Sequence, residues 1–264
     1  MGSEKQIESI RAYWNSRASL GQSAGTQDLI LKELELNTIA EFVRPGMKIL
    51  DAGCGNGVAA IELARRFPVN VTGIDYAAEM VKAAAQTAAT APLLGTIQFH
   101  EGDLTNTSGL PGGFDFIYTE RVIINLPDWE TQRKAITELT GLLRPGGVYA
   151  MLENSQDGLD EINALRQRVG LGPVVAPWHN RYLKDSELRG LSIPGATLEK
   201  VIFYSSTYYF LSRVVNASLA AREGKEPEYD SPVNQLALQL PAIGGMGQSR
   251  AWVWKRVTPD RTAN

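Results

Sequence analysis

The chain has 264 residues, of which 44% are hydrophobic, and this is enough for one sizeable core. Its net charge is −3, its pI is near 5.6, and it has no long run of Lys and Arg, so nucleic acid and anionic membranes are poor candidates for partners. Its one cysteine, Cys54, allows no intramolecular disulfide, which suits a reducing compartment. The start of the sequence lacks an apolar signal core, and no segment approaches the roughly 18 apolar residues of a membrane span, so we expect a cytoplasmic protein that does not enter a membrane.

The first 45 residues are expected to form two helices ahead of the first strand. Apolar residues recur at helical spacing over 4–18 and again over 28–43, and Pro45-Gly46 ends the second helix. Such a unit either caps a cofactor crevice or packs against the edge of a sheet, and both interpretations stay open. If it is a cap, the candidates for contact with a ligand are Tyr13, Gly25 and Thr26.

Strands and helices then alternate along the chain. This β-α-β order predicts a Rossmann-like, doubly wound α/β fold with a mostly parallel seven-stranded sheet, helices on both faces and right-handed crossovers. In such a sheet, ligands bind at the carboxyl ends of the strands. The expected strands are 47–51, 69–74, 96–100, 114–118 and 148–152, and the expected helices are 57–66, 77–89 and 128–143.

After the fifth strand the pattern is less regular. We expect a helix at 157–169, a loop at 170–184, a sixth strand that includes Val201 to Tyr204, and a last strand at 251–257. Residues 212–248, with helices near 212–222 and 232–240, separate two strands that a short hairpin would otherwise join, so we interpret them as an insertion that could act as a lid. We therefore expect a single domain with an N-terminal helical cap (1–45), a cofactor-binding core (46–153) and a substrate-side half (154–264).

The segment from Met47 to Gly57 carries a glycine-rich motif. An apolar strand ends at Asp51 and leads into D-x-G-x-G-x-G, just before a helix. Glycine accepts positive φ and lets a ligand lie against the backbone, while the helix N-terminus offers free N–H groups. Dinucleotides and S-adenosylmethionine both bind to such loops. Val58 occupies the third glycine position of the dinucleotide fingerprint, which disfavours a nicotinamide cofactor.

Polar residues also follow the next three strands. Asp75 after the second strand can accept hydrogen bonds from both ribose hydroxyls. Asp103 follows the third strand, and Glu120 and Arg121 follow the fourth. Any one of these residues is more often a turn former or a helix cap. Together with the glycine loop, however, they mark four strand ends at one edge of the sheet, which is a specific signal.

With these residues, the segment 47–153 resembles the class I S-adenosylmethionine-dependent methyltransferases of the small-molecule type. The resemblance implies that Asp75 binds the ribose of S-adenosylmethionine and that Asp103 and Leu104 flank its adenine. The signature Asn/Asp-Pro-Pro-Tyr/Phe of nucleic-acid amino methyltransferases is missing from 119–128, which argues against a nucleic-acid base as the acceptor. The remaining candidates for cofactor contact are Asp51, Gly53, Gly55, Gly57, Tyr76, Glu120, Tyr13 and Thr26.

Candidates for the acceptor side follow the fifth strand. His179 lies in a loop that can reach over the carboxyl edge, and it is either a general base or an ordinary loop histidine. Glu153 is a second candidate base, an orienting partner for His179, or a structural cap. No metal site is expected. The candidate residues for binding the substrate are Asn154, Trp178, Tyr182 and Arg121.

The leading hypothesis is base-assisted methylation of a hydroxyl on a small molecule such as a sugar or secondary metabolite. The alternative within the same class is C- or N-methylation of a small metabolite, including isoprenoid or aromatic acceptors. Two hypotheses from other classes are an NAD(P)-dependent oxidoreductase and a non-catalytic protein with this fold. The sequence does not specify the acceptor or the oligomeric state.

Overall fold

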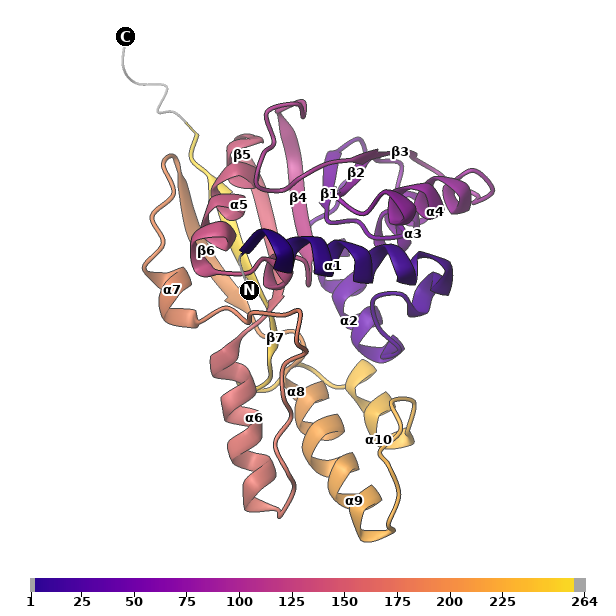
Figure 1. The fold of residues 1–264 in the computed structure, drawn as a ribbon, viewed down its shortest axis with the longest axis vertical. Coiled ribbons are helices and arrows are strands. Elements are labelled where there is room, and N and C mark those ends of the chain that lie inside the picture. Colours follow the sequence, from indigo (N-terminus) through magenta and orange to yellow (C-terminus); the bar gives the residue numbers. More distant parts are fainter. Residues whose placement is uncertain (1–2, 259–264) are drawn as a thin grey trace.

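The computed structural model describes residues 3–258, and these residues form a seven-stranded sheet flanked by helices (Figure 1). The strand order is β3-β2-β1-β4-β5-β7-β6. The first five strands are parallel to one another, whereas β7 is antiparallel to both β5 and β6. The expected doubly wound, mostly parallel fold is therefore confirmed. The strands are β1 (Lys48–Ala52), β2 (Asn70–Asp75), β3 (Thr96–Glu101), β4 (Phe114–Glu120), β5 (Leu143–Asn154), β6 (Ala196–Ile202) and β7 (Ser249–Arg256).

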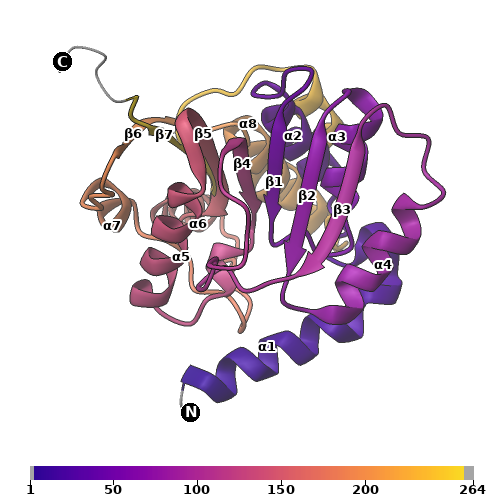
Figure 2. The same ribbon diagram turned by 90° about the horizontal axis from the view of Figure 1, so that it is seen from above.

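The helices cover both faces of this sheet (Figure 2). Ahead of β4 the chain forms α1 (Ser3–Arg17), η1 (Ala18–Ser23), α2 (Leu29–Ala40), α3 (Val58–Arg66) and α4 (Ala78–Ala88). Between β4 and β6 it forms η2 (Ile123–Asn125), α5 (Trp129–Gly141), α6 (Gln156–Arg168) and α7 (Asp185–Arg189). Between β6 and β7 it forms α8 (Ser206–Tyr209), the π-helical η3 (Phe210–Asn216), α9 (Ala217–Arg222), α10 (Pro232–Gln235) and η4 (Leu236–Leu238).

Two apolar cores lie on the opposite faces of the sheet. One packs α2, α3 and α8 against the strands and includes Ile39, Leu63 and Tyr208. The other packs α5, α6 and α7 and includes Ile136 and Trp252. Because both faces are covered, β1 is buried from its second residue to its end, as is typical of a central parallel strand. Its carboxyl end is thereby held rigidly where the glycine loop begins.

Two strand boundaries differ from the sequence prediction. Arg144 to Gly147, which separate the helix expected at 128–143 from the strand expected at 148–152, lie inside β5, where the pairing with β4 shifts register between Phe114 and Phe116. Phe203 and Tyr204, expected in the sixth strand, lie beyond the end of β6, and Tyr204 packs into the same core as α2 instead. The helix expected from residue 212 begins at Ser206. In the first two cases a contact with a distant segment overrides the local pattern.

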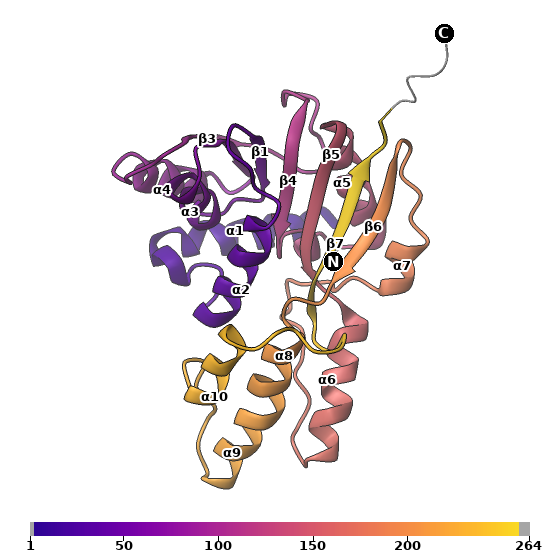
Figure 3. The ribbon, with the colours of Figure 1, turned by 180° about the vertical axis from the view of Figure 1, so that it is seen from behind.

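Two segments extend the fold at the carboxyl edge of the sheet. Figure 2 shows α1 crossing the edge at which β2 and β3 end. The insertion between β6 and β7, residues 203–248, projects beyond the sheet beside α6 (Figure 3). Arg166 of α6 donates a hydrogen bond to the backbone carbonyl of Arg213 in η3, which holds the two together. No helix among residues 3–258 has the length and hydropathy to cross a bilayer.

Candidate active site

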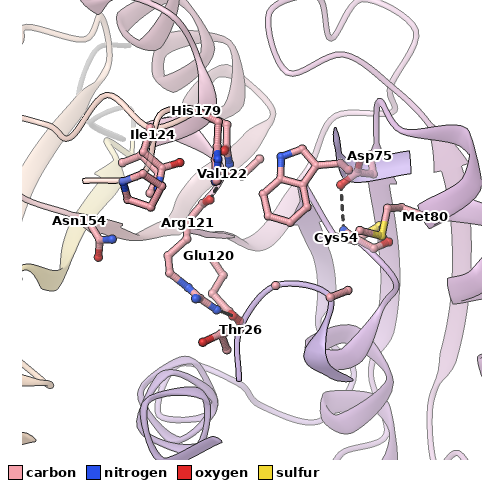
Figure 4. A pocket seen from close by; sticks show the side chains of 18 of the residues that line it. Thr26, Cys54, Asp75, Met80, Glu120, Arg121, Val122, Ile124, Asn154 and His179 are labelled. Atoms are coloured by element: carbon pink, nitrogen blue, oxygen red, sulfur yellow. Dashed lines mark hydrogen bonds and ion pairs between the residues drawn. The ribbon is translucent and has the colours of Figure 1, made fainter. Parts of the chain in front are cut away.

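A cavity of about 440 Å³ lies at the carboxyl edge of the sheet, within the size range of small-molecule sites. The glycine loop and the ends of β2, β4 and β5 form one part of its wall, as the strand-end argument predicts. The remaining wall comes from α1, residues 24–32, the turn after β3, the loop 177–182 and the insertion. Figure 4 shows Cys54, Asp75 and Met80 at one end of the cavity and Asn154 at the other. We call these the cofactor end and the acceptor end.

The three glycines of the loop differ in their roles. Gly53 has φ = 83°, and a Cβ there would overlap the Val122 side chain, so only glycine fits. Gly55 has φ = 51° with open space where a Cβ would lie, and both residues line the cavity. Gly57 does not line it, contrary to the prediction. It is the N-cap residue before α3, with φ = 79°, and a Cβ there would lie 2.7 Å from the Phe99 ring.

Two buried aspartates flank this loop. Asp75 accepts hydrogen bonds from the backbone N–H of Gly55 at 2.8 Å and of Ala77 at 2.9 Å. These bonds hold the loop and the carboxylate together. Asp51 is buried, and its Oδ2 has no hydrogen-bond partner among residues 3–258. Burial raises the pKa of Asp51 to about 7. A cationic ligand beside the loop would satisfy this carboxylate, and S-adenosylmethionine carries an ammonium and a sulfonium, so the residues fit this cofactor.

The segment after β3 completes the cofactor end. Asp103, Leu104 and Tyr76 all line the cavity. The carboxylate of Asp103 accepts hydrogen bonds from the N–H and the hydroxyl of Thr105, both at 2.8 Å, which fixes the turn. Leu104 is buried and Met80 lies nearby on the cavity wall, so an apolar surface adjoins a polar turn. This combination suits a flat heterocycle with an exocyclic amine, as the family resemblance implies.

The N-terminal segment lies over the cavity, so its cap interpretation agrees with the geometry. Tyr13, Trp14 and Thr26 line the cavity from this side. The segment is held by polar contacts: the side chain of Asn15 accepts from the backbone N–H of Glu79 at 3.1 Å, and Asn56 of the glycine loop donates to the carbonyl of Gly21. Closing this cap would exclude water from the cofactor end.

A buried ion network follows β4. Lys32 and Arg121 both pair with Glu120, at 2.5 Å and 3.1 Å, and Arg121 also lies 3.1 Å from Glu35. Burial alone would raise the pKa of Glu120, but Lys32 and Arg121 outweigh it and lower the pKa to about 2. Arg121 has φ = 56°, a conformation that costs energy for a side chain other than glycine. Figure 4 shows the Glu120 and Arg121 side chains meeting on the cavity wall.

Glu153 is not placed to act as a base or to orient His179. It is fully buried, does not line the cavity, and accepts hydrogen bonds from three successive backbone N–H groups, those of Val122, Ile123 and Ile124, at 3.0–3.3 Å. Those bonds fix the turn after β4, and the structural role considered for Glu153 is the correct one. The sequence could not show this, because a strand position does not reveal which distant N–H groups surround a side chain.

His179 does line the cavity. The residue is 9% exposed, and its ring packs at 4.7 Å from the Tyr13 ring and 5.7 Å from the Trp14 ring. Its Nδ1 has no hydrogen-bond partner among residues 3–258, so aromatic packing rather than a carboxylate orients it. Burial, followed by the positive charge of Arg17, lowers the pKa of the imidazole. The ring is therefore neutral near pH 7 and able to accept a proton.

Trp178 is not a wall of the cavity. It is 61% exposed and does not line the cavity, and its ring lies 5.9 Å from that of Tyr13. Asn154, Tyr182 and Arg121 do line the cavity, as predicted. The sequence prediction missed other lining residues because each comes from a segment with no local motif. They include Lys32, Tyr209, Tyr229 and Gln248.

Known proteins share the core and the fold. Residues 49–147 match a family model described as a methyltransferase domain. The 27-O-demethylrifamycin SV methyltransferase of Amycolatopsis mediterranei is 28% identical over 200 residues, which cover 73% of this chain and 69% of that protein. The trans-aconitate 2-methyltransferase of Deinococcus radiodurans is 37% identical over 110 residues, 41% of this chain and 38% of the relative. A sterol 24-C-methyltransferase of Aspergillus fumigatus is 30% identical over 146 residues, which cover 55% of this chain but only 38% of the relative.

Solved structures extend the likeness to nearly the whole chain. The magnesium protoporphyrin IX methyltransferase of Synechocystis with bound SAM superposes with a TM-score of 0.57 at 18% identity, covering 95% of this chain and 97% of that one. The [4+2]-cyclase SpnF gives 0.56 at 22% identity, covering 85% and 80%. At these identities the likeness concerns the fold alone. The match over residues 49–147 identifies this part of the chain as a methyltransferase domain, and the likeness in fold extends over nearly the whole chain.

Proposed function

We propose that the protein transfers a methyl group from S-adenosylmethionine to a hydroxyl of a small molecule, such as a sugar or secondary metabolite, with His179 as the general base. When bound, the cofactor supplies a methyl group that its sulfonium already makes electrophilic. Gly53 and Gly55 would border its methionine part, with the Asp51 carboxylate beside the cationic groups, and Asp75 would bind the ribose hydroxyls. Asp103 and Leu104 would flank the adenine.

The observation that carries the proposal is the position and state of His179. A neutral imidazole lines the same cavity as the glycine loop, buried among aromatic rings. A hydroxyl is a poor nucleophile until it loses its proton, and a base with a pKa near or below neutrality can accept that proton. The cap residues Tyr13 and Trp14 hold the ring in place and exclude water from it. Beyond this, the chain has only to hold the acceptor hydroxyl in line with the methyl–sulfur bond of the cofactor.

C- or N-methylation is the alternative within this family. The curated relatives differ in the atom that their names specify, since they include 27-O-, 24-C- and phosphoethanolamine N-methyltransferases. A C- or N-acceptor would need less help from a base. The neutral His179 therefore favours a hydroxyl, because burying an unused titratable ring is costly.

The other two classes can be separated by binding. A nicotinamide oxidoreductase would bind NAD(P)H, and a non-catalytic protein would bind neither cofactor or would bind without turnover. Isothermal titration with S-adenosylhomocysteine and with NADPH measures this directly. We expect binding of S-adenosylhomocysteine alone, and binding of NADPH alone would contradict the proposal.

Turnover is tested with labelled S-adenosylmethionine and a metabolite extract, followed by mass spectrometry of the labelled product. His179→Ala should lower turnover about 10²–10⁴-fold while leaving the affinity for S-adenosylhomocysteine nearly unchanged. Trp178→Ala is the matched control, because it removes an exposed aromatic neighbour of His179 that does not line the cavity. Unaltered turnover in His179→Ala would exclude His179 as the base.

A further inference from the structure

Two arginines line the cavity from different parts of the chain. Arg121 follows β4 in the core, and Arg213 lies in the π-helical η3 of the insertion. Their side chains are only 18% and 19% exposed. Buried cations at a cavity are costly unless they are paired, and π-helical segments occur frequently at functional sites. Contact with solvent therefore does not explain why these two arginines line the cavity.

Each arginine has a protein partner and an unused donor. Arg213 donates to Asp28 at 3.0 Å and to Ser212 at 2.6 Å, while its Nε has no hydrogen-bond partner among residues 3–258. The rings of Tyr209 and Tyr229 hold the guanidinium at 5.3 Å and 5.0 Å. Arg121 donates from Nη2 to Glu120, and its Nη1 likewise has no partner within the described chain. Both guanidinium groups therefore keep N–H donors for a ligand.

The two arginines act on the same region of the cavity. Burial raises the pKa of the Tyr182 hydroxyl, whereas the charges of Arg121 and Arg213 both oppose this shift, so both guanidinium groups lie within electrostatic range of that hydroxyl. The side chain of Gln248 donates to the same hydroxyl at 3.2 Å. Asn154 also lines this end of the cavity. The acceptor end is therefore rich in donors.

The charges at this end do not balance. Three cations line it, Lys32, Arg121 and Arg213, against two carboxylates, Asp28 and Glu120. Glu35 lies behind Arg121, and burial raises its pKa to about 8, so it holds its proton near pH 7. One positive charge is left in excess. Arg181 does not add to it, because its guanidinium binds Glu187 and Gln132 outside the cavity.

We propose that Arg121 and Arg213 bind an oxyanion of the acceptor, a carboxylate or a phosphate, while a hydroxyl of the same molecule lies at His179. This inference rests on the proposed function for the position of the hydroxyl, but the oxyanion site stands on its own contacts. A planar guanidinium donates two parallel hydrogen bonds to such a group. The tyrosines that pack on Arg213 would at the same time form the apolar wall for the carbon skeleton.

The test uses matched probes that differ only in charge. The protein loaded with S-adenosylhomocysteine is titrated with 4-hydroxybenzoate and 4-hydroxybenzamide, and with cis-4-hydroxycyclohexanecarboxylate and its amide. Inorganic phosphate, as a competitor, separates a phosphate site from a carboxylate site. We expect each carboxylate to bind at least about tenfold more tightly than its amide, since hydrogen bonds between charged groups are the strong ones.

The variants are chosen so that no charge is left buried and unpaired. Asp28→Asn with Arg213→Gln exchanges an ion pair for neutral amides. Glu35→Gln with Arg121→Gln removes Arg121 beside the protonated Glu35, and Glu120 keeps Lys32 as its partner. Both should abolish the preference for the carboxylate and keep the amide affinity. Arg66→Gln removes a cation on the outer surface of α3 and should change neither. A thermal unfolding curve of each variant checks the fold.

Two results would overturn the oxyanion site: equal affinity of the wild-type protein for acid and amide, or an unchanged preference in both double variants. The binding titrations do not depend on turnover, so they test the oxyanion site separately from methyl transfer. They are also repeated without S-adenosylhomocysteine. A carboxylate preference in a protein that methylates no hydroxyl would contradict the proposed function alone. Methyl transfer to neutral alcohols without any carboxylate preference would contradict this inference alone.

Discussion

Glu153 provides the sharpest test of how the acceptor end is built. Its carboxylate is fully buried and accepts hydrogen bonds from the N–H groups of Val122, Ile123 and Ile124. That turn continues into the loop that carries His179, because the N–H of Arg181 donates to the carbonyl of Ile124 at 2.7 Å. We therefore expect Glu153→Ala to destabilise the protein rather than to remove a catalytic group.

The expected loss of stability in Glu153→Ala follows from the three backbone N–H groups that lose their acceptor. Each buried N–H without a partner costs about 1–3 kcal/mol. Water that enters the space left by the Glu153 side chain would satisfy part of this need, so we expect a total loss of about 3–5 kcal/mol. For a chain of this size, 1 kcal/mol shifts Tm by about 2–4 °C, so the melting temperature should fall by roughly 10 °C. Glu153→Gln keeps one acceptor oxygen and should lose about half as much.

The assay is urea unfolding of both variants, followed by turnover at a temperature where all are folded. Glu226→Ala, in an exposed loop, is the matched control and should leave stability unchanged. The folded pKa of Glu153 is raised by burial to about 7, above its ordinary 4.5. The folded state therefore holds the extra proton, and wild-type stability relative to Glu153→Gln should fall as the pH rises from about 4.5 to 7.

A small effect would refute this reasoning. If Glu153→Ala loses less than about 1 kcal/mol, the three hydrogen bonds do not support the turn. If it stays stable but loses turnover, and its pH–rate profile loses an ionisation, then Glu153 is a base after all. A structural role would leave the shape of that profile unchanged.

The other predictions concern the cofactor end and the ion network. Gly53→Ala should lower the free energy of unfolding by well over about 2 kcal/mol and abolish cofactor binding, because the new Cβ overlaps the Val122 side chain. Gly55→Ala should lower it by only about 1–2 kcal/mol, because Gly55 has a positive φ but open space for a Cβ. Thermal unfolding measures both losses. Asp75→Asn should weaken S-adenosylhomocysteine binding by about tenfold or more in calorimetry. Glu35, with a folded pKa of about 8, makes stability fall as the pH rises from about 4.5 to 8, and Glu35→Gln should flatten that dependence in urea unfolding measured across this range.

The fold was largely predictable because its signals are local. Hydrophobic periodicity and glycine turns located every strand and the major helices, and the order of strands and helices implied a parallel sheet. The sequence prediction is wrong where a contact with a distant segment determines the local conformation. Tyr204 continues a β-branched and aromatic run, yet it leaves the sheet because the core beside α2 receives its ring. Such a contact has no counterpart in a window of neighbouring residues.

The two ends of the cavity were predictable to different degrees, for a physical reason. Parallel strands bring their carboxyl ends to one edge, so Asp51, Asp75 and Asp103 could be grouped from sequence alone. The acceptor end is assembled from loops and the insertion, where order in the chain says nothing about proximity. Arg213 and Asp28 lie 185 positions apart, yet they form an ion pair at the cavity.

That ion pair also links the two segments that cover the cavity. Asp28 caps the start of α2 in the N-terminal segment, and it accepts hydrogen bonds from Tyr208 at 2.5 Å and from Arg213 at 3.0 Å, both in the insertion. Any movement of the cap would therefore move the wall of the acceptor end. Because Thr26 lies on the same segment and lines the cavity, ordering of that segment by one ligand would help to order the site of the other. Binding of cofactor and acceptor should thus be positively coupled, and by linkage the coupling must be equal in both directions.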